Sequence, residues 1–324
     1  LTVRPRRRRA QGRLSVVLYH EVTDEPSQFL NDHEMVVSPA LFEFQLSVIQ
    51  QHFRVIDPDT LVNGDWQHDE CVLLTFDDGF TGIFRHAAPL LHRHHLPAVF
   101  FLNVGDLEAD HSWAALNEYL ICAHPAYRRL LEQQDGFAIP RGLLALRASP
   151  QTLEDYCARV GFDQPQFRRY MGAYGSPADL EICAARYPEI FFGNHLFRHY
   201  NAVRLTDEEL GRAYRQNEQR LQRLANARAL FAFPFGVPNA GYSQRALQAV
   251  KALGARAVFS AFPRVDRFGP VEIFHRISLG RSHDTRARIL TRLRGTGTRM
   301  SLQRGLGAVG VRRYQDVLAQ VRKP

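Results

Sequence analysis

Apolar runs alternate with segments of helical periodicity along most of the chain. Short apolar runs predict β-strands at residues 14–19, 72–76, 97–103, 189–193, 229–233, 256–260 and 273–279. Apolar positions three or four residues apart predict helices at 38–52, 81–94, 206–225 and 242–253. Alternation of this kind is typical of a parallel sheet covered by helices, and a parallel sheet that closes is a barrel. We therefore expect an α/β barrel fold.

A long insertion separates the third predicted strand from the fourth, at about residues 107–188. Helical patterns run through it at 113–122, 126–134, 153–160 and 177–187, with no internal repeat and no metal-ligand spacing. Such an insertion can cover one side of the barrel mouth and shape a substrate pocket. It can equally be a helical elaboration without contact to any substrate, and the sequence leaves both interpretations open.

The positive charge of the chain is concentrated at its two ends. The formal net charge of the 324 residues is +8, with six arginines and no acid in residues 1–13, and ten basic groups against one acid in residues 285–324. Residues 14–284 therefore carry a charge of about −7. We predict a basic N-terminal arm at 1–13, one α/β domain at 14–284 and a basic helical tail at 285–324. The acidic middle argues against a nucleic-acid partner.

Neither a signal peptide nor a transmembrane segment is visible in the sequence. It has no apolar run of about 18 residues, the length that a membrane-spanning helix needs. The arginines within residues 4–9 resemble the charged start of a signal peptide, but the apolar run at 14–19 is too short for a signal core. We expect the cytoplasm or the inner membrane face, although the chain begins with leucine and its true N-terminus stays open.

Two consecutive carboxylates follow the apolar run at 72–74. Residues 75–79 read Thr-Phe-Asp-Asp-Gly, which places Asp77 and Asp78 at the end of a buried strand. Two buried charges are costly unless something pairs with them, and a metal ion can bind one while the other acts as a base. The same pattern also fits a plain turn, in which Gly79 supplies the backbone freedom.

Two histidines four residues apart follow another apolar run. His195 and His199 come after Ile-Phe-Phe at 190–192, and a helical turn would bring both imidazoles to one side. Imidazole with carboxylate suits Zn²⁺ and its first-row neighbours, and three protein ligands leave positions for water and substrate. A lone pair of this spacing is commonly structural. Its occurrence together with the two aspartates, each after an apolar run, favours a catalytic metal site.

These motifs resemble those of a known family, the NodB-type polysaccharide deacetylases of carbohydrate esterase family four. Residues 75–79 and 193–199 look like its first two motifs, and Phe-Ala-Phe-Pro-Phe-Gly at 231–236 is similar to its third. The run at 97–102 matches the strand that usually follows the first motif, and the resemblance covers roughly residues 14–280. It implies a distorted (β/α) barrel of the NodB type with a helical insertion.

The resemblance also implies a role for each motif residue. Asp77 would be the catalytic base, and Asp78, His195 and His199 would hold a divalent metal. Zinc is the expected ion, with cobalt, nickel and manganese as alternatives. Pro234 and Phe235 would line the substrate groove, and a backbone N–H near Phe235 would help to bind the oxyanion.

An N-terminal match narrows the resemblance to one subgroup. Val-Val-Leu-Tyr-His-Glu-Val at 16–22 and the predicted helix at 38–46 look like members with a rearranged strand order, including deacetylases of poly-N-acetylglucosamine. In these proteins an early histidine protonates the leaving amine, which makes His20 the expected general acid. His275, in the last predicted strand, is the alternative. His20 also fits a core histidine at a strand end.

Two positions depart from the family's pattern. Leu196 stands where a Thr or Ser is usual, and Ala232 stands where the third motif commonly begins with an Arg that orients the base. Arg276 could approach the base from the neighbouring strand instead, so we place it among the residues of the substrate groove. The Leu196 departure puts the geometry of the loop in doubt more than metal binding.

The function implied by the resemblance is metal-dependent hydrolysis of an N-acetyl group on an amino sugar, with release of acetate. The substrate would be a polysaccharide, an oligosaccharide or a lipid-linked glycan, and the sequence does not separate acetyl from formyl groups. A catalytically impaired NodB-fold protein that only binds glycans is the alternative, and Leu196 and Ala232 favour it.

The start of the basic tail resembles an amphipathic helix. Four arginines at 286, 288, 292 and 294 surround apolar residues that include Ile289 and Leu293. This pattern fits a charged surface helix, and it also fits attraction to an anionic membrane surface.

Overall fold

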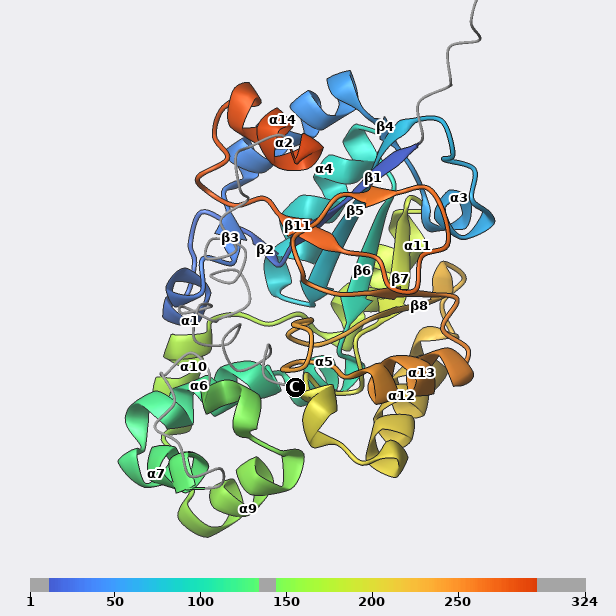
Figure 1. Cartoon of the computed structure of the whole chain (residues 1–324). Coiled ribbons are helices and arrows are strands. Elements are labelled where there is room, and N and C mark those ends of the chain that lie inside the picture. Colours follow the sequence, from blue (N-terminus) through green and yellow to red (C-terminus); the bar gives the residue numbers. More distant parts are fainter. Residues whose placement is uncertain (1–11, 134–143, 296–324) are drawn as a thin grey trace, which may run out of the picture.

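A curled, mainly parallel β-sheet forms the centre of the protein (Figure 1). The structure is a computed structural model that describes residues 12–133 and 144–295. Its six main strands are β1 (Arg13–Tyr19), β5 (Glu70–Asp78), β6 (Ala98–Leu102), β7 (Ile190–Asn194), β8 (Ala227–Ala232) and β9 (Ala257–Phe259), hydrogen-bonded in that order. All five neighbouring pairs are parallel. These strands include six of the seven predicted from apolar runs.

Short strands complete the sheet. At its edge β10 (Asp266–Arg267) pairs antiparallel with β1, β11 (Arg276–Ser278) pairs parallel with β1, and β4 (Arg54–Val55) pairs parallel with β5. A separate parallel pair joins β2 (Glu21–Val22) to β3 (Val36–Val37). Of these four pairings, only the one that involves the seventh predicted strand, at 273–279, was anticipated.

The two ends of the curled sheet meet through the segment that leads into β11. Phe274 forms a parallel bridge with Phe259 of β9, and its N–H donates to the carbonyl of Val258 at 2.8 Å. Two residues later the same segment begins to pair with β1. The expected distorted barrel is therefore confirmed as a curled parallel sheet that the 274–278 segment bridges.

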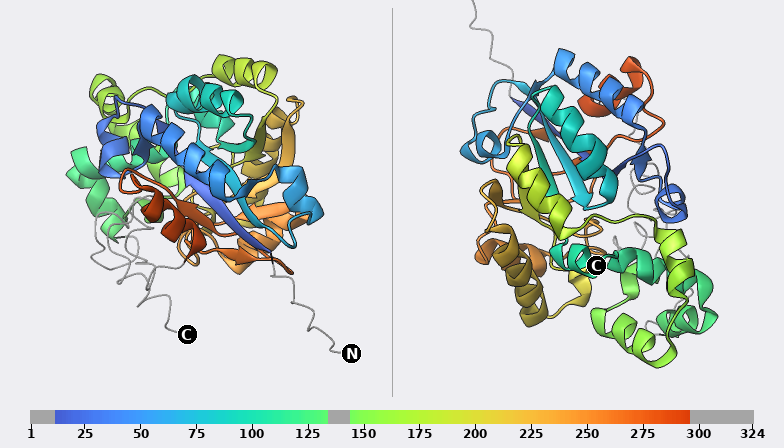
Figure 2. Two further views of the ribbon diagram at one scale, coloured as in Figure 1. Left: turned by 90° about the horizontal axis from the view of Figure 1, so that it is seen from above. Right: turned by 180° about the vertical axis from the view of Figure 1, so that it is seen from behind.

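Helices surround the outside of this sheet (Figures 1 and 2). They are α2 (Pro39–His52), α4 (Ala88–Arg93), α11 (Pro177–Arg186), α12 (Asp207–Leu221) and α13 (Gln244–Ala252). A capping box is present at α12, where Thr206 and Glu209 satisfy each other's backbone N–H groups. Ser243 caps α13 by accepting a hydrogen bond from the Ala246 N–H. The helix predicted at 81–94 instead begins with a π-helical turn, η1 (Ile83–Ala87).

The insertion is helical, as its sequence pattern predicts. Together with α11 it contains α6 (Trp113–Ala123), α7 (Pro125–Gln133), α9 (Pro150–Val160), α10 (Gln164–Met171) and the short η2 (Ala145–Arg147). Helices α6, α7, α9 and α10 form a lobe beside the sheet, next to α1 (Gln28–Asp32) (Figure 1). The remaining short elements are α3 (Pro58–Asn63), α5 (Val104–Ala109) and η3 (Ala202–Arg204). The sequence pattern did not predict these three elements or α10.

The start of the basic tail packs against the domain. Helix α14 (Arg286–Arg294) buries Ile289 and Leu293 completely, and Ser15 of β1 donates a hydrogen bond of 2.6 Å to the Leu293 carbonyl. Two of the apolar residues of the predicted amphipathic helix therefore lie in the core, which fits the interpretation as a charged surface helix. Residues 1–11 and 296–324, which make up most of the predicted arm and tail, lie outside the described part of the chain.

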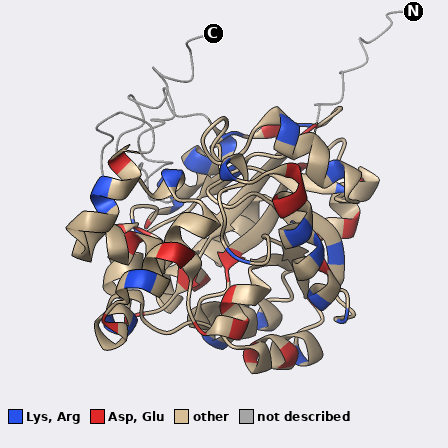
Figure 3. Cartoon of the chain, turned by 90° about the horizontal axis from the view of Figure 1, so that it is seen from below, with Lys and Arg blue, Asp and Glu red and all other residues tan. Residues whose placement is uncertain are grey.

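Charges on the described surface are mixed rather than sorted. Figure 3 shows Lys and Arg interspersed with Asp and Glu along the described elements. Within residues 12–133 and 144–295, no helix combines the length and the apolar character that crossing a membrane requires.

Candidate metal and catalytic site

The polar residues singled out in the sequence gather at the carboxyl edge of the sheet. Asp77 and Asp78 are the last two residues of β5, His195 follows the last residue of β7, and His20 follows the last residue of β1. Parallel strands place their carboxyl ends at one edge, which is where α/β barrels carry their active sites. Three separate strands therefore supply one site.

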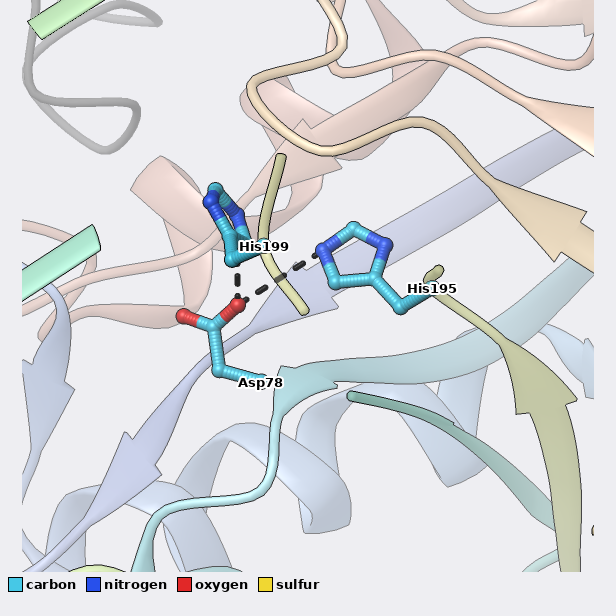
Figure 4. Close-up of side chains that lie close together, drawn as sticks. All are labelled: Asp78, His195 and His199. Atoms are coloured by element: carbon cyan, nitrogen blue, oxygen red, sulfur yellow. Dashed lines mark ion pairs between the residues drawn. The ribbon is translucent and has the colours of Figure 1, made fainter. Parts of the chain in front are cut away.

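Asp78, His195 and His199 lie within reach of a single ion (Figure 4). One ligand atom from each lies within 4.8 Å of the others. The Asp78 Oδ1 atom is 3.5 Å from His195 Nε2 and 3.4 Å from His199 Nε2. All three residues are buried, so bulk water does not screen them. Figure 4 shows both imidazoles directed toward the same carboxylate oxygen.

These three residues fit a divalent metal. Tetrahedral coordination at zinc–ligand distances of about 2.0–2.1 Å separates neighbouring ligand atoms by about 3.3 Å, close to the two Asp78–imidazole distances. Asp78 Oδ1 is buried and receives no hydrogen bond from any described residue. A buried carboxylate oxygen without a donor is costly, and a cation would satisfy it. The donor set of two imidazoles and one carboxylate is also one that zinc accepts.

The two histidines do not lie on a helical turn, and that expectation was wrong. Residues 195–200 form an irregular loop after β7, in which Leu196 has a φ of 63°. The turn at Leu196 nevertheless brings the two rings together, with their centroids 5.1 Å apart. The two imidazoles therefore come together as expected, but an irregular loop brings them together and not a helical turn.

A buried set of asparagines holds this loop. Asn194 Oδ1 accepts from the Leu196 N–H at 2.9 Å and from the Asn217 side chain at 2.9 Å. The Asn103 side chain donates to the carbonyls of His195 and Leu196. Each of these asparagines is fully buried. These bonds hold the loop without a hydroxyl at position 196, where the side chain of Leu196 is buried in the core.

The ring of His195 is fixed by the strand that carries the third motif. Its Nδ1 atom lies 2.7 Å from the carbonyl oxygen of Ala232, so Nδ1 carries the proton and Nε2 keeps its lone pair for an ion. The backbone of Ala232 thus has a role even though the arginine expected at that position is absent. His199 packs edge-on against the Phe235 ring, with centroids 4.6 Å apart.

Arg276 holds Asp77 in a bidentate ion pair. The two guanidinium nitrogens Nη1 and Nη2 donate to the two carboxylate oxygens at 2.6 and 2.7 Å, and Nε donates to the Ser260 carbonyl at 3.0 Å. Burial by itself would raise the pKa of Asp77, but the charge and hydrogen bonds of Arg276 favour the ionised carboxylate, and the pKa is lowered. Asp77 is therefore ionised at neutral pH, as a base must be. Arg276 does approach from β11, as the sequence suggested, and its guanidinium is engaged by Asp77.

The two candidate general acids lie in different surroundings. His20 lines the same cavity as Asp77, Asp78 and His199, and burial lowers its pKa. His275 instead bonds through Nδ1 to Asp266 at 2.8 Å and is not among the residues that line this cavity. The cavity therefore contains His20 and leaves His275 outside.

The cavity is lined from several parts of the chain. Besides the motif residues, its walls come from α1 and the segment after it, from the loops that follow β8 and β9, and from the insertion. The lining residues are Leu18, His20, Phe29, His33, Met35, Asp77, Asp78, Ala114, Glu118, Ala145, Leu146, His199, Phe233, Phe235, Ala261 and Arg276. Phe235 is where the sequence placed it, whereas Pro234 is buried and does not line the cavity. The insertion contributes four of these residues.

Strained backbone marks the same region. Asp78, Leu196 and Phe235 all have positive φ angles, of 75°, 63° and 60° respectively. Non-glycine residues rarely adopt this conformation, and such outliers concentrate at functional sites. Tyr174, from the insertion, supports one of them by donating a hydrogen bond of 2.8 Å to the Asp78 carbonyl.

Solved structures share this architecture. Streptococcus pyogenes deacetylase PplD in complex with acetate has a TM-score of 0.59 at 13% identity, covering 88% of this chain and 99% of that one. IcaB from Ammonifex degensii has a TM-score of 0.56 at 19% identity, covering 87% and 98%. A de-N-acetylase from Aggregatibacter actinomycetemcomitans has a TM-score of 0.54 at 15% identity, covering 87% and 100%. The fold is that of the NodB-type deacetylases.

Sequence comparison agrees with this class. The polysaccharide deacetylase family model matches residues 65–126, which include both aspartates at the end of β5. Comparison with curated protein sequences finds no match. The chain therefore has the fold of the NodB-type deacetylases, and its segment 65–126 is similar to the polysaccharide deacetylase family.

Proposed function

We propose that the protein is a metal-dependent carbohydrate N-deacetylase that hydrolyses the N-acetyl group of an amino sugar and releases acetate. The observation that carries this proposal is the meeting of Asp78, His195 and His199 around one buried position, with a second carboxylate alongside. A divalent ion bound there would polarise the acetamide carbonyl and lower the pKa of water. Zinc is the expected ion, with cobalt, nickel and manganese as alternatives.

The residues of the chain divide the remaining work. Asp77, ionised and aligned by Arg276, accepts the proton of the attacking water. The backbone N–H of Phe235 donates no hydrogen bond to any described residue, so it is free to bind the developing oxyanion. His20 lies in the same cavity and protonates the departing amine. Its place in the cavity favours it over His275.

Purified protein tests the proposal directly. We expect about one divalent ion per chain and release of acetate from N-acetylglucosamine oligomers or from a lipid-linked N-acetyl sugar. Removal of the ion with a chelator should abolish acetate release, and zinc should restore it. Metal-loaded protein that binds these glycans without releasing acetate would support the alternative, a glycan-binding protein. Protein that binds no divalent ion would contradict the proposal.

The two departures that favoured a glycan-binding protein have structural replacements. The arginine absent at Ala232 is supplied by Arg276, and the hydroxyl absent at Leu196 is replaced by the buried asparagines around the loop. Both replacements support the enzyme over the binding protein.

Replacing Arg276 should separate base alignment from metal binding. In Arg276→Ala the Asp77 carboxylate loses both of its guanidinium donors, and misplacement of a catalytic group commonly lowers turnover by about 10²-fold. Arg276→Lys should recover only part of this loss, because an ammonium group cannot bond both oxygens as the guanidinium fork does. The measurements are kcat for acetate release and metal content. Unchanged turnover in Arg276→Ala would remove Arg276 from the mechanism.

We also propose that the insertion helps to bind the sugar. Glu118 on α6 is only 5% exposed and lines the cavity that contains Asp77 and His199. A buried carboxylate is a strong acceptor for sugar hydroxyl groups. Glu118→Gln should therefore raise KM by about tenfold, the equivalent of one weakened charged hydrogen bond, with little change in kcat.

The matched control for this prediction is Glu108→Gln. Glu108 is an exposed carboxylate on α5 that pairs with Arg220 and does not line the cavity. It should leave both kinetic constants unchanged. If Glu118→Gln also left KM unchanged, the insertion would be an elaboration without contact to the sugar at this position.

A further inference from the structure

A buried carboxylate lies directly behind the loop that carries the two histidines. Asp106, on α5, is fully buried, and its Oδ2 atom accepts a hydrogen bond of 3.0 Å from the Trp113 N–H at the start of α6. Its Oδ1 atom is 3.9 Å from Nη1 of Arg198, in the histidine loop. Burial raises the pKa of Asp106 to about 7, and the backbone N–H of His199, which also faces this carboxylate, offsets part of that rise. Asp106 thus joins the insertion to the loop.

Buried polar atoms without a hydrogen-bond partner lie on this carboxylate and on the residues next to it. Three buried polar atoms on adjoining residues have no hydrogen-bond partner among the described residues: Asp106 Oδ1, Trp113 Nε1 and His199 Nδ1. Their chemistry is complementary, because the first is an acceptor and the other two can donate. Folded proteins leave few buried polar atoms unpaired, and a single buried water commonly joins such groups.

The two histidines differ in what holds their second nitrogen. His195 Nδ1 is fixed by the Ala232 carbonyl at 2.7 Å, whereas His199 Nδ1 has no such partner in the described structure. A histidine that binds metal through one nitrogen nearly always donates the other N–H to a carboxylate, a carbonyl or a water. The backbone N–H of His199 faces the buried carboxylate of Asp106, whereas its ring Nε2 atom lies 3.4 Å from Asp78 Oδ1.

We propose that Asp106 is a positioning residue of the metal site, whose carboxylate accepts the Nδ1–H of His199 directly or through one buried water. The bond directs His199 Nε2 toward Asp78 Oδ1 and makes the imidazole a better ligand. This inference rests on the proposed function only in requiring that the site binds a metal. The competing interpretation is that Asp106 merely anchors the start of α6 through the Trp113 N–H.

Metal titration of variants tests the role of Asp106. Asp106→Asn and Asp106→Ala should bind zinc with a Kd about 10- to 100-fold higher than the wild type, measured by calorimetry on metal-free full-length protein. The visible spectrum of the cobalt-loaded protein should also change, because the geometry of one ligand changes. A residue that only anchored a helix would lower thermal stability without moving either readout.

Asp266→Asn is the matched control. Asp266 is an equally buried carboxylate, only 1% exposed, that accepts a backbone N–H from His275 at 2.8 Å outside the cavity. Its replacement should destabilise the fold to a similar extent while leaving the zinc Kd unchanged. If the Asp106 variants bind zinc with the wild-type Kd, the inference is overturned. Wild-type protein that binds no zinc would instead overturn the proposed function.

A measurement on the unaltered protein covers the case in which the Asp106 variants do not fold. In the zinc-loaded wild type, long-range ¹H–¹⁵N spectra of the histidines should show His199 coordinated through Nε2, with a protonated Nδ1 that exchanges slowly with solvent. An Nδ1–H that exchanges as fast as that of an exposed imidazole would overturn the inference.

Discussion

Asp77→Asn should reduce acetate release by roughly 10²- to 10⁴-fold while the metal stays bound, because this is the range that a general base commonly contributes. The amide keeps the shape of the carboxylate but cannot take a proton from water. Asp77 is also not needed to hold the ion, since its carboxylate is already occupied by Arg276. The measurements are kcat and the metal content of the purified variant.

Asp78→Asn is the counterpart that makes this test specific. Asp78 lies within ion-pair distance of both imidazoles, whereas Asp77 reaches only His195, at 3.7 Å. The Asp78 variant should therefore lose the ion as well as turnover. If the two variants exchanged these outcomes, the base and the ligand would have to be assigned the other way round.

His195→Ala should abolish metal binding and turnover together. The imidazole is one of three ligands, and its loss should weaken binding by more than the roughly 10- to 100-fold that changes outside the ligand shell cause. Metal content after dialysis and acetate release are the two measurements. A variant that kept its ion would show that His195 is not a ligand.

His275→Ala provides the comparison for His195→Ala. His275 is a largely buried histidine with a carboxylate partner, but that partner is Asp266 and the residue lies outside the cavity. It should keep the ion. Retained turnover in the same variant would also support His20 as the acid, and a collapse of turnover with metal retained would return that role to His275.

The strands and the motif positions were predictable because their signals are local. An apolar run followed by polar residues marks the end of a buried parallel strand, and β5 and β7 both follow this rule. Since the carboxyl ends of parallel strands share an edge, the convergence of Asp78 with His195 followed from the fold class. The capping box of α12 is local in the same sense.

The supporting residues were not predictable, because their partners are distant in the sequence. Asn103 and Asn217 hold the histidine loop from α5 and α12, and nothing in the local sequence distinguishes them from surface asparagines. Asp106 lies in a stretch of mixed polarity whose burial depends on how the insertion packs. The backbone of the histidine loop was also misjudged, since a spacing of four residues fits both a helical turn and the irregular loop found here.

The contact between Arg276 and Asp77 was a hypothesis that depended on closure of the sheet. Its side chain comes from β11, which pairs with β1, and it is separated from Asp77 by 199 positions in the chain. Sequence spacing alone gives no reason to pair the two. The absence of an arginine at Ala232 was the signal that another guanidinium had to be found.

Bridging of the sheet by the 274–278 segment has a consequence for how the protein matures. Arg276 is the last residue of the candidate site to be synthesised, because β11 follows every predicted ion ligand in the chain. A chain that ends before residue 274 would therefore lack the guanidinium donor that Asp77 has in the complete domain.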